Sequence, residues 1–333
     1  MAPSGNMLNK LTLFFLISSV LAFVSCNEEP KREKKKGMAM SPTPDFNADS
    51  AYHFVQAQVN FGPRVPDTDE HRACGDWLVS KFIQYGATVI EQTGNVKRYD
   101  DVTLPLRNII ASYNLDRAAR VLLCAHWDTR PFADQGTVNI EKPIDGANDG
   151  GSGVAVLLEI ARQLSVEKPN IGIDIVLFDV EDQGQPDFDT NQQKRDTYCL
   201  GSQYWGNNLH DESYNAMYGV LLDMVGATGA TFSMEQVSLQ YAGGQTKKVW
   251  DTGNQLGYGR HFMYKKTPPI TDDHVYVNLL TGIPTLDIIE YSGATISNFG
   301  PYWHTHEDNM EVIDRKTLKA VGQTVLQIIF NEK

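Results

Sequence analysis

The chain has fewer basic than acidic residues, 29 Lys and Arg against 41 Asp and Glu, and its formal net charge is −12. Phosphate binding needs clustered Lys and Arg, so this balance argues against a nucleic-acid-binding protein. The one basic cluster, at residues 31–36, has no hydrophobic periodicity, and we interpret it as part of a solvated tether. With 41% hydrophobic and 21% charged residues, the composition is typical of a globular protein with a full core.

The sequence also lacks an apolar run long enough to cross a membrane. The run at residues 11–24 follows Lys10 and is shorter than the roughly 20 residues that a spanning helix needs, but it suits the core of a secretory signal. A small residue, Ser25, then precedes Cys26, which resembles the bacterial lipoprotein signal, in which the cysteine is lipidated and becomes the new N-terminus. An ordinary cleaved signal with a coincidental cysteine is the alternative.

These features predict three segments. Residues 1–25 form a lipoprotein signal peptide, residues 26–45 a charged tether, and residues 46–333 the folded domain. We expect a periplasmic protein that is anchored to a membrane through lipidated Cys26.

Cysteines are few. Four occur in 333 residues, and three remain after Cys26: Cys74, Cys124 and Cys199. Because three is an odd number, the fold is not a fully paired disulfide scaffold, and at most one pair can form. Cys124 lies in a strand-like stretch, where a small buried side chain is a better interpretation than a nucleophile.

From residue 46 onward, helical and extended patterns alternate, without internal repeats. Apolar residues at helical spacing predict helices at 49–62, 67–86, 150–164, 245–257, 271–282 and 314–330. Runs rich in branched apolar residues predict strands at 87–99, 107–114, 119–126, 173–180, 217–226 and 283–290. The alternation predicts a single α/β domain with a central mixed, largely parallel sheet flanked by helices on both faces, the early strands forming an antiparallel edge.

Polar residues follow several predicted strands at the point where each strand ends. They are His126 and Asp128, Asp149 at the start of the next helix, Glu181 and Asp182, Asp223, and His304 in a loop after the last strand. The carboxyl ends of parallel strands meet at one edge of a sheet, where ligands bind. Two histidines and several carboxylates at that edge suit Zn²⁺, and a dication would offset the repulsion among the acids. Taken singly, each could be a cap or surface group; Asp149 could simply cap its helix.

Six motifs between residues 120 and 310 carry a resemblance to a known family. In order they are AHWDTR, DGANDGGSGVAVLLEIAR, LFDVEDQG, LLDMVG, DDH and YWHTHEDN. The chain resembles the co-catalytic zinc exopeptidase superfamily and, within it, the animal-type glutaminyl-peptide cyclotransferases, which also occur in bacteria. The resemblance implies a mixed sheet flanked by helices, one zinc ion per chain, and peptides and proteins with N-terminal glutamine as substrates.

The resemblance also implies roles for individual residues. Asp149, Asp182 and His304 match the zinc ligands, Glu181 matches the proton-transfer residue, and Asp223 and Asp272 match two further carboxylates of the cyclase site. The family usually has a Glu-Glu pair where this chain has Glu181-Asp182, and the shorter Asp requires a small shift of the loop or the metal.

Four more residues are expected around this site. Trp303 and Phe299 match aromatic walls of a cyclase substrate pocket, whereas aminopeptidase relatives more often have Tyr before the histidine ligand. His126 would support the metal site from behind, near Asp128, or have a merely structural role. The loop 183–198 lacks the Trp of animal cyclases, and Phe188 is its nearest aromatic residue.

The expected reaction is the cyclisation of N-terminal glutamine to pyroglutamate, with release of ammonia. Two alternatives remain. A two-zinc aminopeptidase would use His126 and Asp223 as additional ligands. A lipoprotein that only binds peptide ends would have no use for Glu181 as a proton shuttle.

Overall fold

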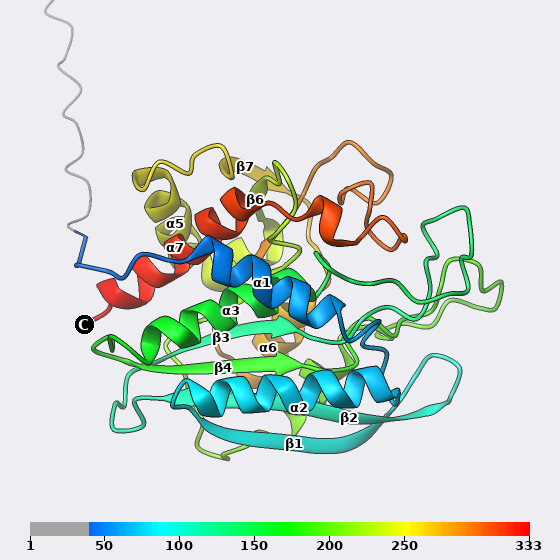
Figure 1. Ribbon diagram of the computed structural model, residues 1–333, viewed down its shortest axis with the longest axis horizontal. Helices are drawn as coiled ribbons and strands as arrows, with labels where there is room; N and C mark the ends of the chain where they lie inside the picture. The colour runs from blue at the N-terminus through cyan, green and yellow to red at the C-terminus, as the bar shows by residue number, and fades with distance from the viewer. Residues whose placement is uncertain (1–39) are drawn as a thin grey trace, which may run out of the picture. The chain divides into compact units, whose positions relative to one another are not determined.

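A computed structural model describes residues 40–333 of the chain (Figure 1). The predicted signal peptide, Cys26 and most of the predicted tether lie outside the described residues. Within the described part, no helix is long and apolar enough to cross a membrane.

A six-stranded sheet forms the centre of the domain, in the order β1-β2-β4-β3-β5-β8. Its strands are β1 (Thr88–Lys97), β2 (Thr103–Tyr113), β3 (Arg120–His126), β4 (Gly172–Phe178), β5 (Gly219–Asp223) and β8 (Thr285–Ile289). β2 pairs antiparallel with both β1 and β4, and the other neighbours are parallel. The predicted mixed, largely parallel sheet with an antiparallel edge is therefore confirmed.

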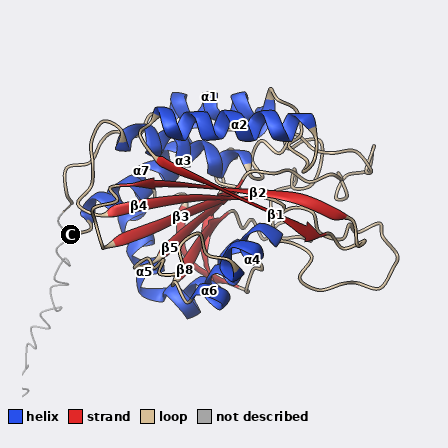
Figure 2. Cartoon of the chain, turned by 90° about the horizontal axis from the view of Figure 1, so that it is seen from below, coloured by secondary structure: helices blue, strands red, loops and turns tan. Residues whose placement is uncertain are grey.

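Helices cover both faces of this sheet (Figure 2). One layer contains α1 (Ala48–Val59), α2 (Asp69–Gln84), α3 (Gly151–Leu164) and α7 (Arg315–Asn331), and the other contains α4 (Leu200–Asn207) and α6 (Asp273–Thr281). α5 (Gln236–Gln255) packs against β8 and α7. A 3₁₀ helix, η1 (Met310–Val312), precedes α7, and two short strands, β6 (Phe232–Glu235) and β7 (Phe262–Thr267), pair parallel outside the main sheet.

The side chains of β3 show why the sheet is buried on both faces. Val121, Leu123 and Ala125 pack into the core cluster that includes α3 and α7, whereas Leu122 and Cys124 pack into the cluster that includes Trp205 of α4 and Val277 of α6. This alternation follows from the two-residue period of a strand. Cys124 is a buried apolar side chain, as expected, and Cys74, Cys124 and Cys199 are all unpaired.

The parallel strands β3, β4, β5 and β8 direct their carboxyl ends to one edge of the sheet. The non-glycine residues near that edge that have positive φ include Val180 (56°), Met224 (48°) and His304 (53°). Such a conformation is costly, above all for β-branched Val180, and strained residues of this kind cluster at functional sites. The carboxyl edge of the sheet is therefore a candidate functional site.

Candidate active site

A pocket of about 210 Å³ opens at the carboxyl edge of the sheet. It is lined by acids and a histidine, Asp149, Glu181, Asp182, Asp223, Asp272 and His304, and by the aromatic residues Tyr198, Phe299 and Trp303, among others. All six residues predicted to be catalytic or metal-binding thus meet in one pocket, although they are spread over residues 149–304.

Asp149, Asp182 and His304 form one group whose ligand atoms lie within 4.8 Å of one another. His304 Nε2 lies 3.2 Å from Asp182 Oδ1 and 3.6 Å from Asp149 Oδ2. All three side chains are buried, and Asp182 Oδ2 has no hydrogen-bond partner. A buried carboxylate oxygen without a partner is costly unless a cation satisfies it, so the group fits a metal ion with nitrogen and oxygen ligands.

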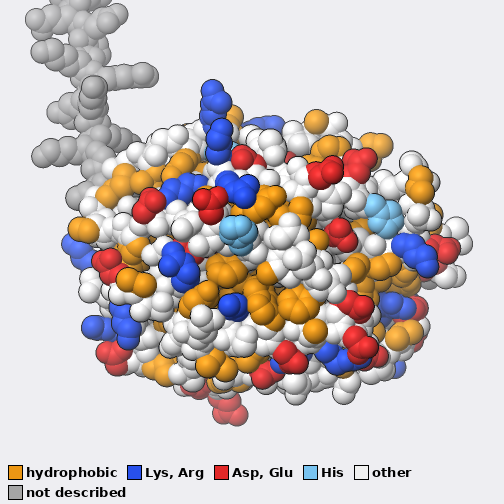
Figure 3. Space-filling view, viewed as in Figure 1, with side chains coloured by type: hydrophobic (Ala, Val, Ile, Leu, Met, Phe, Trp, Pro, Cys, Tyr) orange, Lys and Arg blue, Asp and Glu red, His pale blue; other side chains and the backbone are white. Residues whose placement is uncertain are grey.

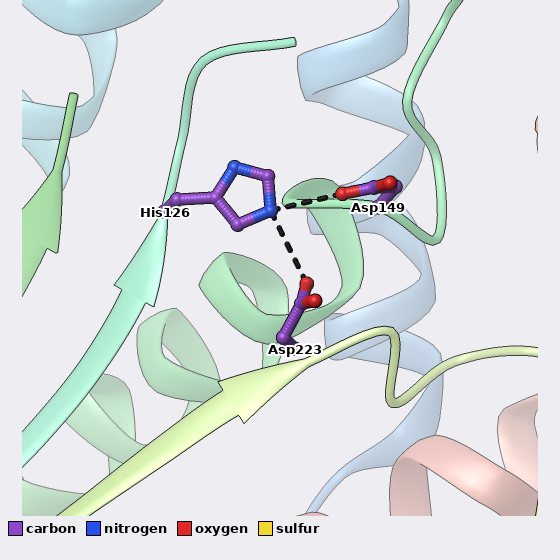
Figure 4. A group of neighbouring side chains, drawn as sticks. All are labelled: His126, Asp149 and Asp223. Carbon is purple, nitrogen blue, oxygen red and sulfur yellow. Dashed lines mark hydrogen bonds and ion pairs between the residues drawn. The ribbon is translucent and has the colours of Figure 1, made fainter. Parts of the chain in front are cut away.

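A second group shares Asp149 with the first. His126 Nε2 lies 3.0 Å from Asp149 Oδ1 and 3.2 Å from Asp223 Oδ1, and Figure 4 shows both carboxylates converging on this nitrogen. The capping role considered for Asp149 is not seen, because the N-cap of α3 is Gly150 and no side chain caps that end of the helix. Asp149 therefore lies between two potential metal positions.

Glu181 lies beside the first group, in the turn after β4. It is 9% exposed, and its Oε1 accepts a hydrogen bond from the Cys199 thiol at 3.1 Å. Burial raises the pKa of the Glu181 carboxyl well above its ordinary value, and the charge of His126 opposes this shift. A buried carboxyl with a raised pKa is suited to accepting and returning a proton.

Asp128 holds the turn that carries Glu181 and Asp182. Its carboxylate accepts hydrogen bonds from the backbone N–H of Glu181 at 2.9 Å, the N–H of Asp182 at 3.3 Å and the side-chain amide of Gln183 at 3.2 Å. His126 Nδ1 lies 3.7 Å from Asp128 Oδ1. Asp128 therefore connects the turn after β4 with the end of β3.

Asp223 and Asp272 also line the pocket. Burial, and next the charge of Asp223, raise the pKa of Asp272 to about 6. Burial and the charge of Asp149 raise the pKa of Asp223 as well. Carboxyl groups with raised pKa values can share protons at neutral pH.

Aromatic side chains form the wall above the metal-ligand group. The Trp303 ring stacks on the His304 imidazole with centroids 3.7 Å apart, and the Phe299 ring lies 4.9 Å from Trp303. On the loop side, Tyr198 lines the pocket, whereas Phe188 packs against Phe132 and is not among the lining residues. The aromatic residue on the side where animal cyclases place their loop Trp is thus Tyr198.

Sequence reasoning missed several polar residues that surround the pocket. Asp308 accepts hydrogen bonds from the backbone N–H of Asn148 at 2.7 Å and of Asp149 at 3.0 Å, and so fixes the end of the loop before α3, which carries the candidate ligand Asp149. Arg130 and Asp134 lie behind the ligands on the loop after β3, and Cys199 contacts Glu181. All four lie in loops or at a helix end, where no periodic pattern marks them.

Comparison with known proteins agrees with this geometry. The chain is similar to the crystal structure of Tannerella forsythia glutaminyl cyclase, with 52% identity and a TM-score of 0.86 over 87% of this chain and 100% of that one. It is 27% identical to the aminopeptidase YwaD of Bacillus subtilis over 65% of this chain and 42% of the relative. It is 25% identical to glutaminyl-peptide cyclotransferase of Bos taurus over 68% of this chain and 65% of the relative.

The chain thus spans less than two thirds of the length of these two curated relatives. The Peptidase family M28 model matches residues 108–329, which include every residue placed in the pocket. The chain belongs to Peptidase family M28.

Proposed function

We propose that the protein is a zinc-dependent glutaminyl-peptide cyclotransferase, an acyltransferase that converts N-terminal glutamine to pyroglutamate and releases ammonia. The observation that carries the proposal is the small pocket in which the Trp303 indole stacks on His304 while the buried Glu181 carboxyl lines the same space. Such a pocket has room for one short side chain next to a metal ion and a proton acceptor. The high identity to the Tannerella forsythia enzyme over its whole chain supports this function.

Asp149, Asp182 and His304 would hold one zinc ion per chain. Bound zinc would supply a Lewis acid that polarises the γ-amide carbonyl of the substrate glutamine. Trp303 and Phe299 would hold the glutamine side chain in the pocket, and Tyr198 would close its loop side.

The reaction forms a bond between the α-amine nitrogen and the γ-carbonyl carbon and breaks the bond from that carbon to the amide nitrogen. Because both reacting groups belong to one residue, the pocket only needs to fold the side chain back onto the amine. Glu181 would take the proton that the amine loses and give it to the departing ammonia. Asp223 and Asp272, which line the same pocket, would take part in this proton transfer by sharing protons.

One observation favours a second candidate, a two-zinc aminopeptidase. His126, Asp149 and Asp223 have their ligand atoms within 4.8 Å of one another, and with Asp182 and His304 they complete two metal-ligand groups around a shared Asp149. In that enzyme a water molecule would be the nucleophile, and Glu181 would accept its proton.

The physiological substrates would be peptides and proteins with N-terminal glutamine. We also propose that residues 1–25 are a lipoprotein signal peptide, that residues 26–45 tether the domain to a membrane through Cys26, and that the enzyme faces the periplasm. Nucleic acid is not an expected partner, and on the face seen in Figure 3 Lys and Arg side chains lie among Asp and Glu side chains.

A single assay separates the two activities. The purified protein is incubated with a glutaminyl dipeptide and with a leucyl dipeptide, and ammonia and free amino acids are measured in the same samples. A cyclotransferase releases ammonia from the glutaminyl dipeptide and neither ammonia nor amino acids from the leucyl dipeptide. Release of free leucine without ammonia from the glutaminyl dipeptide would identify the aminopeptidase instead.

A further inference from the structure

Arg130 is a fully buried arginine directly behind the metal-ligand group. Its guanidinium holds Asp134 in a bidentate pair, with Nε 2.6 Å from Oδ1 and Nη2 2.5 Å from Oδ2. Removing two charges from water is costly, so a buried ion pair is weak evidence for a role in stability alone. The position of this pair next to the ligands suggests another role.

Asp134 connects the pair to the histidine ligand. Its Oδ1 lies 3.4 Å from Nδ1 of His304, while Nε2 of the same ring lies 3.2 Å from Asp182. The backbone N–H of Gln135 also donates to the His304 carbonyl at 3.1 Å. A metal-ligating histidine commonly donates its other ring N–H to a carboxylate, which fixes both the tautomer and the ring orientation. His304 Nδ1 is buried without a hydrogen-bond partner, and Asp134 lies close enough to take this role.

The same guanidinium connects the pair to the aspartate ligand. Arg130 Nη1 donates to the carbonyl of Asp182 at 3.2 Å and to that of Gly184 at 3.4 Å, and it lies 3.6 Å from Asp182 Oδ1. The guanidinium carbon also lies 5.2 Å from the ring centroid of Tyr198, which lines the pocket. Arg130 thus contacts the Asp182 backbone and the Asp134 carboxylate, which faces His304. It also contacts the Tyr198 ring in the pocket wall.

We propose that Arg130 and Asp134 are positioning residues that preset two of the three zinc ligands, Asp182 and His304, before the metal binds. Arg130 fixes the Asp182 backbone and Asp134, and Asp134 orients the His304 ring. The inference rests on the proposed zinc site. Removing such an outer partner typically lowers metal affinity 10- to 100-fold, and we expect a loss of about that size here.

The test compares the zinc affinity of the wild type and of Asp134→Asn by competition with a chromophoric chelator. Asn has nearly the same shape but no charge, so the zinc dissociation constant should rise about 10- to 100-fold. The metal-free variant should melt at a lower temperature, because buried Arg130 loses its counter-charge, but it should keep its secondary structure. The matched control is Asp69→Asn, which removes the acid of an exposed pair with Arg72 and should leave zinc affinity unchanged.

Arg130→Lys provides a second variant, because Lys keeps the charge but not the planar fork that reaches Asp134 and the Asp182 carbonyl together. Its zinc affinity should also fall, and excess zinc should restore much of the kcat of both variants. Wild-type zinc affinity in Asp134→Asn would overturn the proposal. So would a loss of affinity found only in metal-free variants that have lost their secondary structure, since the pair would then serve the fold. If the wild type binds zinc but releases no ammonia, the proposed activity fails, while the comparison of affinities still stands.

Discussion

Replacing Glu181 by Gln tests the proposed division of labour at the end of β4. Gln keeps the length of the side chain and an oxygen that can accept a hydrogen bond from the Cys199 thiol. The backbone N–H of residue 181 can still donate a hydrogen bond to Asp128. The Glu181 carboxylate accepts its hydrogen bond from Cys199 rather than from the proposed metal ligands Asp182 and His304. The change therefore removes the proton acceptor while leaving the site in place.

The expected loss follows from what remains in the pocket. Loss of a general acid–base group costs ~10²–10⁴-fold in rate, which corresponds to about 3–5 kcal/mol of activation free energy. Asp272 has an oxygen within 4.8 Å of Glu181, so it could accept the proton from a poorer position and limit the loss. The double variant Glu181→Gln/Asp272→Asn should then be slower than Glu181→Gln alone.

Ammonia release from a glutaminyl dipeptide measures turnover, and metal analysis of the same preparation measures bound zinc. The control is Glu167→Gln, the same change at an exposed position after α3, which should leave both unchanged. Near-normal turnover in Glu181→Gln would refute the proton-transfer role. Loss of zinc from that variant would show that Glu181 is a ligand or holds one in place.

Four further predictions concern the metal, the pH profile and the membrane anchor. Asp182→Ala should lose zinc and activity together, whereas Asp187→Ala, in the exposed part of the same loop, should keep both in metal analysis. The wild type should carry one tightly bound zinc per chain, and dialysis against a chelator should abolish activity reversibly; two equivalents of similar affinity would favour the aminopeptidase. Plotted against pH, kcat/KM should rise through neutrality to a mildly alkaline plateau. The substrate α-amine, with a reference pKa of about 7.7–8.0, must be unprotonated to react, and Glu181, whose pKa is raised, must be deprotonated to accept the proton. A fall of kcat/KM over this range would contradict the mechanism. Cys26→Ser should move the protein from the membrane fraction to the soluble fraction with activity retained, and unchanged detergent partitioning would count against lipidation.

The sequence predicts the inner strands of the main sheet because they are runs of branched apolar residues in a sheet that is covered on both faces, whereas β1 is an edge strand without buried residues. β4 is the clearest case, since all of its residues are buried. The residues that directly follow these strands could then be placed at one edge by topology alone. For this reason the sequence could predict that Glu181, Asp182 and Asp223 lie at the carboxyl edge of the sheet.

Other elements have no comparable pattern. β6 has only four residues, and α4 begins after Cys199, whose backbone is left-handed. α5 was predicted to begin at residue 245 but begins at Gln236, because a kink at Ala242 and the adjacent Gly243 and Gly244 interrupt its helical pattern. These elements depend on tertiary contacts rather than on local periodicity.

The polar residues behind the ligands were not predicted for a related reason. Arg130 and Asp134 lie on the long loop between β3 and α3, and Gly184 lies on the loop after β4. Their contact depends on how the two loops fold against each other, which neither strand period nor helix period encodes. An arginine followed four residues later by an aspartate suggests an ion pair in a helix, but this segment is not helical.

The shorter side chain at the proposed ligand position 182 has a physical explanation in these contacts. The peptide groups on both sides of the Asp182 side chain are held, because its N–H donates to Asp128 and its carbonyl accepts from Arg130. The backbone at residue 182 therefore has little freedom to move away from the metal-ligand group. A glutamate here would add a carbon–carbon bond of about 1.5 Å, and its carboxylate would be driven toward His304, whose Nε2 already lies 3.2 Å from Asp182 Oδ1. In this chain a backbone that is held on both sides therefore suits the short side chain of Asp182.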